Sequence, residues 1–120
     1  MPIIHVSVTG KQDTRRKRYF MEFAANSIRS HTNTLPKNIY VYFHEMEPEN
    51  VRKTAPTVRI DWTMIPDRTN EVKKAIMGEL TDELAKLTGE KRSEIAITFN
   101  DIPLPNAMPG GITRADNYNW

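Results

Sequence analysis

The fold is decided by residues 58–89, VRIDWTMIPDRTNEVKKAIMGELTDELAKLTG. The segment from Val58 to Met64 predicts a strand. Thr69 is a favourable helix N-cap, and the apolar side chains after it recur at helical spacing until Gly89 ends the pattern. The apolar face of this predicted helix consists of Val72, Ile76, Leu80, Leu84 and Leu87. With a return strand over Glu94–Phe99, the second half of the chain reads as a β-α-β unit.

The first half follows the same plan. Residues Ile3–Val8 form a short β-rich run that stops at a Thr-Gly turn signal. A helix is expected from Asp13 or Thr14 to about His31, because that stretch lacks Gly and Pro and carries an apolar face. A second strand is expected over Ile39–Phe43, where β-branched and aromatic residues are dense.

A shift of 56 residues aligns the two halves. The identities are Ile4 with Ile60, Lys17 with Lys73, Thr32 with Thr88, Ile39 with Ile95, Phe43 with Phe99 and Asn50 with Asn106. A strand, a crossover helix and a return strand make a parallel pair. The chain is therefore predicted to be α/β (α+β), with two tandem β-α-β units forming one four-stranded sheet and two helices on one face. We expect residues 1–120 to form a single domain of repeats at about 2–56 and 58–111, followed by a tail over 112–120.

Helices on one face leave the other face of the sheet uncovered. We expect this face to carry apolar and aromatic residues such as Val41, Phe43 and Trp62 or their neighbours. Self-association with the sheets inward would bury them and protect the strand edges. The expected assembly is a homo-oligomer, a homotrimer in particular.

Composition limits the possible functions. The chain has 17 basic and 15 acidic side chains, a net charge of +2 and no cysteine. Thiol chemistry is thereby excluded, and the weak charge gives no reason to expect a nucleic-acid or membrane partner. No stretch is long and apolar enough for a signal peptide or membrane span, so a cytoplasmic location is expected. The histidines lack metal-site spacing and the glycines lack a phosphate-loop pattern, so neither a metal nor a cofactor is expected.

Pro2 is the leading catalytic candidate. A small second residue permits removal of the initiator methionine, which would leave Pro2 with a secondary amine. An amine abstracts protons only when it is neutral, and burial and a nearby cation both lower its pKa. Arg68, at a strand-to-helix turn, is the expected cation.

These features resemble a fused member of the 4-oxalocrotonate tautomerase group. The resemblance rests on the early proline at the start of a strand, the tandem β-α-β units and Arg68 within Pro-Asp-Arg-Thr, and it covers residues 2 to about 111. It implies that Pro2 moves a proton between carbon and oxygen of a small enol or keto acid. It also implies that Arg68 binds the substrate carboxylate, where its first-half counterpart is Gln12.

The chain departs from the pattern of that group in two places. Val58 falls where a second proline is expected, and Tyr40 and Ala96 stand where the group has a second arginine. Tyr40 is nevertheless a candidate substrate-binding residue, because its hydroxyl can donate a hydrogen bond to a carbonyl or enolate oxygen.

Two alternatives stay open. The same scaffold supports a hydratase, dehalogenase or decarboxylase of small unsaturated acids, for which Glu45, Asp61 and Asp101 are candidate water-placing acids by residue type alone. A non-catalytic binding module is the other, based on the basic cluster at residues 11–18. A solvated helix face explains that cluster more simply, so tautomerisation of a small keto or enol acid is the preferred prediction.

Overall fold

The computed structural model describes residues 1–116, and the last four residues of the predicted tail lie outside them. The main elements are β1 (Ile3–Thr9), α1 (Thr14–His31), β2 (Tyr40–Met46), β3 (Thr57–Thr63), α2 (Asn70–Thr88) and β4 (Ala96–Ile102). Short 3-10 turns precede and follow β2 and β4. No described helix is long and apolar enough to cross a membrane.

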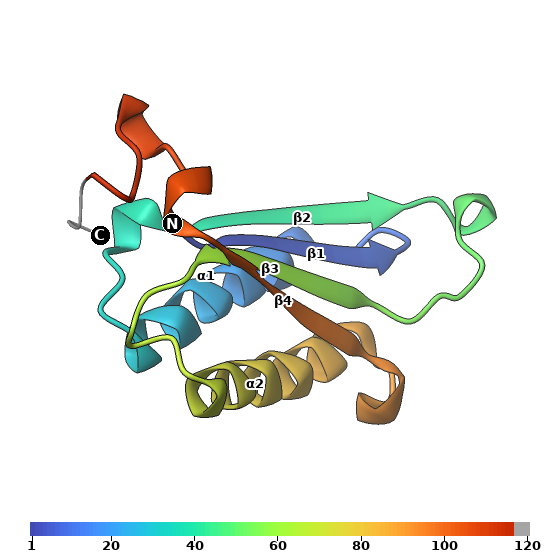
Figure 1. The fold of residues 1–120 in the computed structure, drawn as a ribbon. Helices are drawn as coiled ribbons and strands as arrows, with labels where there is room; N and C mark the ends of the chain where they lie inside the picture. Colours follow the sequence, from blue (N-terminus) through green and yellow to red (C-terminus); the bar gives the residue numbers. More distant parts are fainter. Residues whose placement is uncertain (117–120) are drawn as a thin grey trace.

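The four strands form one sheet in the order β2-β1-β3-β4. Each β-α-β unit contributes a parallel pair, β1 with β2 and β3 with β4. The two units meet at the centre, where β1 and β3 run antiparallel and Ile3 lies opposite Asp61. Both helices cover the same face (Figure 1). The predicted architecture is confirmed.

Local sequence signals explain where the helices begin and end. The Asp13 carboxylate accepts a hydrogen bond from the Arg16 N–H at 3.0 Å and caps α1. Thr69 caps α2 in the same way through the Val72 N–H. Gly89 ends α2 with a φ of 77°, a left-handed conformation that glycine adopts without steric cost.

The core lies between the sheet and the helices. It is built from alternate side chains of the central strands and the apolar stripes of α1 and α2. Trp62 is fully buried there, and Val41 and Phe43 pack against the same cluster. The expectation that these three residues lie on the uncovered face is therefore wrong. Their neighbours Tyr40 and Tyr42 are the exposed aromatic residues of β2.

The repeat is offset by 56 residues everywhere except in the first strand of each unit. Thr32 and Thr88 confirm the offset, because each hydroxyl bonds back to the carbonyl four residues earlier. The strands β1 and β3, however, begin 54 residues apart. Ile4 therefore corresponds to Val58 and not to Ile60.

The position equivalent to Pro2 is consequently Pro56 and not Val58. The Tyr40 N–H donates to the Pro2 carbonyl at 3.0 Å, and the Ala96 N–H donates to the Pro56 carbonyl at 3.4 Å. The two extra residues of the second unit lie in the loop between β3 and α2, which carries Arg68. A single constant shift places identical residues correctly on either side of such an insertion only where the insertion does not intervene.

Candidate functional site

Pro2 lies at the start of β1, and less than 2% of it is exposed. The antiparallel pairing of β1 and β3 brings this start beside the end of β3, near Asp61 and Trp62. The hydrogen bond from the Tyr40 N–H to the Pro2 carbonyl anchors residue 2 to the neighbouring strand as well. Residue 2 is thus held rigidly at one end of the sheet.

Arg68 follows β3 at the same end of the molecule, and only 6% of it is exposed. Its guanidinium donates to the Thr63 carbonyl at 2.8 Å, the Thr63 hydroxyl at 2.9 Å and the Thr34 hydroxyl at 3.0 Å. These acceptors are all neutral oxygens, and the buried Arg68 Nε has no hydrogen-bond partner. Burial lowers the pKa of Arg68 to about 10, with Arg114 contributing, so the side chain is still a cation at neutral pH. It retains capacity to bind an anion.

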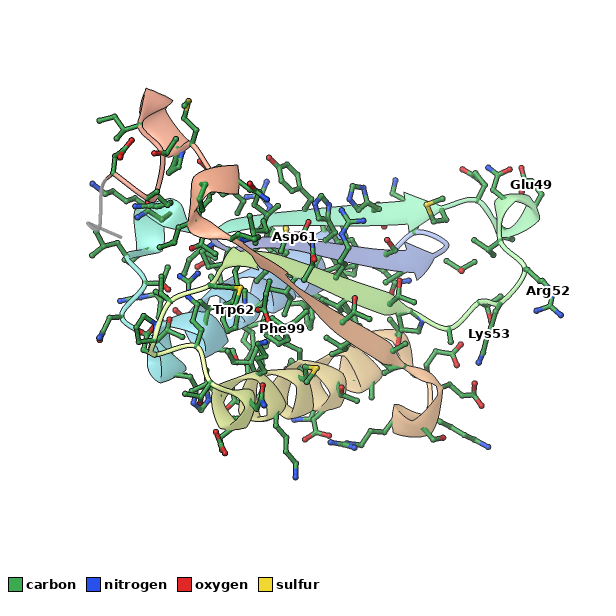
Figure 2. The ribbon with its side chains drawn as sticks, in the orientation of Figure 1. Glu49, Arg52, Lys53, Asp61, Trp62 and Phe99 are labelled. Carbon is green, nitrogen blue, oxygen red and sulfur yellow. The ribbon has the colours of Figure 1, made fainter. Side chains whose placement is uncertain are left out.

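Trp62 forms the floor beneath this guanidinium. The Arg68 guanidinium carbon lies 4.9 Å from the indole ring centroid, a cation–π arrangement. The indole N–H donates to the Asp101 carboxylate at 2.8 Å, and Phe99 packs against the ring (Figure 2). Lys73 binds the second oxygen of Asp101. These contacts fix the indole, and through it the plane of Arg68.

The amino terminus senses this environment directly. Burial, reinforced by the positive charges of Arg68 and Arg114, lowers the pKa of the Met1 amine from 8.0 to about 5. Both causes disfavour the protonated form. A basic nitrogen at this end of the sheet is therefore neutral at physiological pH.

Arg114 is a residue of this site that the sequence prediction missed, since it was assigned to the tail. Only 3% of it is exposed. The chain turns back after Gly110 and Gly111, both at positive φ, and the Arg114 N–H donates to the Ala107 carbonyl at 2.8 Å. The C-terminal segment thereby lies beside the amino terminus (Figure 1). The Gly-Gly pair was the one signal of this reversal in the sequence.

The other predicted side chains are placed differently. Tyr40 touches Pro2 through its backbone, whereas its side chain is 44% exposed and belongs to the uncovered face. Glu45 lies at the opposite end of the sheet, bound to Lys17 and the Gln12 N–H. Of the three candidate acids, only Asp61 keeps a buried oxygen without a hydrogen-bond donor.

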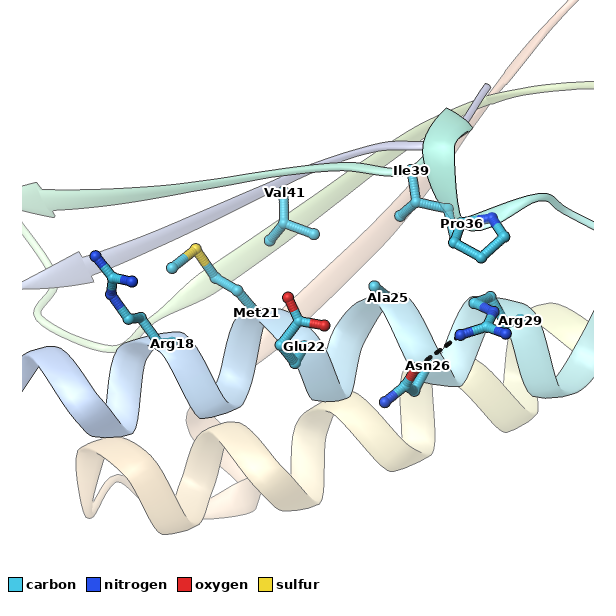
Figure 3. Close-up of a pocket in the computed structure, with 9 residues that line it drawn as sticks. All are labelled: Arg18, Met21, Glu22, Ala25, Asn26, Arg29, Pro36, Ile39 and Val41. Atoms are coloured by element: carbon cyan, nitrogen blue, oxygen red, sulfur yellow. Dashed lines mark hydrogen bonds between the residues drawn. The ribbon is translucent and has the colours of Figure 1, made fainter.

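The basic cluster at residues 11–18 does not act as one group of free cations. Lys17 forms an ion pair with Glu45 at 2.8 Å, and Arg16 donates to the Lys86 carbonyl at the end of α2. Arg18 instead borders a groove between α1 and the edge strand β2 (Figure 3).

That groove is the larger hollow, with a volume of about 770 Å³, against about 430 Å³ for the pocket beside Arg68 and Asp101. Its floor is mainly apolar, and a hydrogen bond at 3.5 Å joins Asn26 and Arg29 at its rim. None of its lining residues has a resolved pKa perturbation. Perturbed ionisable groups mark functional sites better than volume does, so the end of the sheet with Pro2 and Arg68 is the candidate site.

Comparison with known proteins agrees with this choice of site. The tautomerase family, described as tautomerase enzymes, matches residues 56–116. A probable tautomerase of Streptococcus pneumoniae serotype 4 (strain ATCC BAA-334 / TIGR4) is 37% identical over 59 residues, which cover 49% of this chain and 95% of the relative. The equivalent protein of strain ATCC BAA-255 / R6 is similar to the same extent.

Solved structures share the fold of the whole chain. A fused 4-OT that forms a symmetric trimer has a TM-score of 0.85 at 14% identity, covering 95% of this chain and 97% of its own. Pt0534, inactivated by 2-oxo-3-pentynoate, has a TM-score of 0.81 at 19% identity, with 94% and 97% covered. Malonate semialdehyde decarboxylase has a TM-score of 0.72 at 9% identity and 90% coverage of both chains. At these identities the likeness concerns the fold alone.

Proposed function

The chain belongs to the tautomerase family, and on that basis we propose that it interconverts enol and keto forms of a small carboxylate substrate, with Pro2 as general base. The proposal requires that Met1 be removed, so that Pro2 carries the terminal secondary amine. It extends the family assignment to one reaction and one base.

The lowered pKa of the Met1 amine is the observation that carries the proposal. After removal of Met1, the Pro2 nitrogen becomes the terminal amine one residue further into the same buried end. Burial and the two guanidinium groups then act on that nitrogen and favour its neutral form. A neutral amine accepts a proton, which a general base must do.

The reaction balances without any further reactant. The Pro2 amine takes the proton of the enol hydroxyl while the carbonyl forms, and the resulting ammonium returns that proton to carbon. Arg68 holds the substrate carboxylate, since its guanidinium can offer charge-assisted hydrogen bonds in fixed geometry. Negative charge that develops on the enolate oxygen is stabilised by donors at the same end of the sheet.

Tyr40 is proposed as one such donor. Its backbone is hydrogen-bonded to residue 2, so its position is tied to that of the base. A Tyr40→Phe variant should lower kcat and leave the binding of an unreactive acid unchanged, because the hydroxyl is proposed to act on charge that develops during the reaction. Unchanged kcat would remove Tyr40 from the mechanism.

We further propose that the protein assembles as a homotrimer through the uncovered face of the sheet. This face exposes Tyr42 and Met46, and His5 stacks on Tyr42 and lies 3.2 Å from His44 through ring nitrogens. The fused 4-OT structures of the same fold are trimers. Sedimentation should give a trimeric mass, and Tyr42→Lys should shift it toward the monomer. A monomer in the unmodified protein at micromolar concentration would contradict this assembly.

The activity is tested by offering the processed protein a panel of small enol acids and unsaturated halo-acids and identifying the products by NMR. The proposal predicts ketonisation, with no water added and no halide or carbon dioxide released. Hydrated, dehalogenated or decarboxylated products, without ketonisation of any enol acid, would assign the site to a different reaction of the same scaffold.

A further inference from the structure

Two buried arginines approach the amino terminus from opposite ends of the chain. Arg68 comes from the loop after β3, and Arg114 comes from the C-terminal segment that folds back beside residue 1 (Figure 1). Both are more than nine-tenths buried. Both lie close enough to the Met1 amine to act on it electrostatically.

Placing two cations together in a water-poor region is unfavourable unless anions accompany them. The hydrogen bonds of Arg68 go to uncharged threonine oxygens, and its buried Nε has no partner. The charge of Arg114 disfavours that of Arg68, which shows that the two guanidinium groups interact. This end of the sheet is therefore electrostatically suited to an anionic ligand with more than one negative group.

The segment that carries Arg114 is built into the fold. Ala107, whose carbonyl accepts the Arg114 N–H, is itself only 3% exposed. The 3-10 turn at Leu104–Asn106 follows directly from β4, the strand that carries Asp101. The position of Arg114 is consequently linked through the backbone to the Trp62–Asp101 contact beneath Arg68.

We propose that Arg114 is a specificity-determining residue of this site, a second guanidinium that the C-terminal segment supplies to bind a second anionic group of the substrate. The identity of the substrate as an enol or keto acid rests on the proposed function. The preference for a second anionic group rests only on the two arginines.

Matched pairs of unreactive acids test this preference without turnover. Fumarate and crotonate differ by exchange of one carboxylate for a methyl group, and muconate and sorbate form the same pair on a longer chain. Calorimetric titration of the processed protein should show tighter binding of the diacid in at least one pair. Equal affinity within both pairs would overturn the proposal.

The Arg114→Gln variant should weaken binding of the preferred diacid about 10-fold or more, as expected for loss of hydrogen bonds to a charged group, and leave the matched monoacid unchanged. Arg114→Lys should restore part of the difference, because it keeps the charge without the planar donor fork. Arg52→Gln is the control, since Arg52 is an exposed arginine on a loop beyond the far end of the sheet (Figure 2).

Thermal unfolding separates loss of binding from loss of structure. If Arg114→Gln unfolds early, the diacid-to-monoacid affinity ratio of the folded Arg114→Lys protein decides, and a ratio equal to that of the unmodified protein would contradict the role of Arg114. Because the acids do not react, an inactive Pro2 would leave this result unchanged. Failure of the proposed reaction and failure of this inference are thus distinguishable.

Discussion

The two ends of the sheet share a backbone plan and differ in chemistry. At one end the carbonyl of Pro2 accepts a hydrogen bond from the first residue of β2, and at the other the carbonyl of Pro56 accepts one from the first residue of β4. Each half also has a lysine paired with an acid at equivalent positions, Lys17 with Glu45 and Lys73 with Asp101. The repeat therefore preserves the scaffold around both prolines.

The differences concern the groups that matter for proton transfer. The Pro56 nitrogen is an amide within the chain and cannot act as a base, whereas Pro2 becomes a terminal amine once Met1 is removed. The cation at the Pro2 end, Arg68, has Gln12 as its counterpart at the other end, and the Gln12 N–H is bound to Glu45. One duplicated scaffold thus carries one candidate site, because only one end combines a free amine with buried guanidinium groups.

The sharpest way to test this contrast is to exchange each proline for alanine. Pro2→Ala should lower kcat for enol ketonisation by about 100-fold or more, the range expected for loss of a positioned general base. Pro56→Ala should leave kcat unchanged, since its nitrogen has no proton-transfer role. Steady-state kinetics on both processed proteins makes the comparison, and equal effects of the two substitutions would refute it.

The arginine and its counterpart come next. Arg68→Ala should raise KM by about 10- to 100-fold, because the carboxylate loses hydrogen bonds from a charged donor. Gln12→Ala should change neither kcat nor KM. A fall in kcat with KM unaffected would show that Arg68 acts on the transition state and does not anchor the substrate.

The pH–rate profile should reflect the lowered amine pKa. The neutral amine is the active form, so kcat/KM should be constant through neutral pH and decline only in acid, as the amine becomes protonated. Arg68→Ala removes one of the charges that lower the pKa of the terminal amine, and should move this decline toward higher pH. An acid limb that does not move in the variant would argue against electrostatic control by Arg68.

The smallest effects should come from the two ion pairs. Asp101→Asn should reduce activity a few-fold, since Asp101 positions Trp62 beneath Arg68, whereas Glu45→Gln should not affect it. Equal activity losses in the two variants would contradict a positioning role for Asp101.

The ion pairs should also contribute to acid sensitivity of the fold. Hydrogen bonds from Lys17 and the Gln12 N–H lower the pKa of Glu45. Burial opposes the same change at Asp101, where the hydrogen bonds from Lys73 and Trp62 prevail and the pKa is also lowered. A carboxyl group with a lowered folded-state pKa stabilises the protein above its ordinary value of about 4, and this contribution is lost as pH falls through the folded-state pKa. Chemical unfolding of Glu45→Gln between neutral and acidic pH should show a smaller loss of stability than the unmodified protein.

Much of the fold could be predicted from the sequence because local signals carry it. Asp13, Thr69 and Gly89 mark helix ends, and the alternation of apolar residues marks the strands. The orientation of Trp62 was mistaken because a strand pattern does not say which face meets the helices. The equivalence of Pro56 with Pro2 was missed because the two-residue insertion changes the offset within one unit.

The candidate site was only partly predictable for a related reason. Pro2 and Arg68 were identified by residue type and by their places at the ends of strands. Arg114 depends on a chain reversal at Gly110 and Gly111 and on packing against Ala107, which are tertiary events without periodicity. The support of Arg68 by Trp62 likewise requires the register of β3 with β4.

Direct titration of the Pro2 nitrogen by NMR, in processed protein labelled with ¹⁵N-proline, tests the central claim most closely. Mass spectrometry of the same sample first establishes that Met1 is absent. The account predicts that this nitrogen is neutral at pH 7, with a pKa below that of an ordinary secondary amine. A nitrogen that stays protonated until alkaline pH, or a native protein that retains Met1, would contradict it.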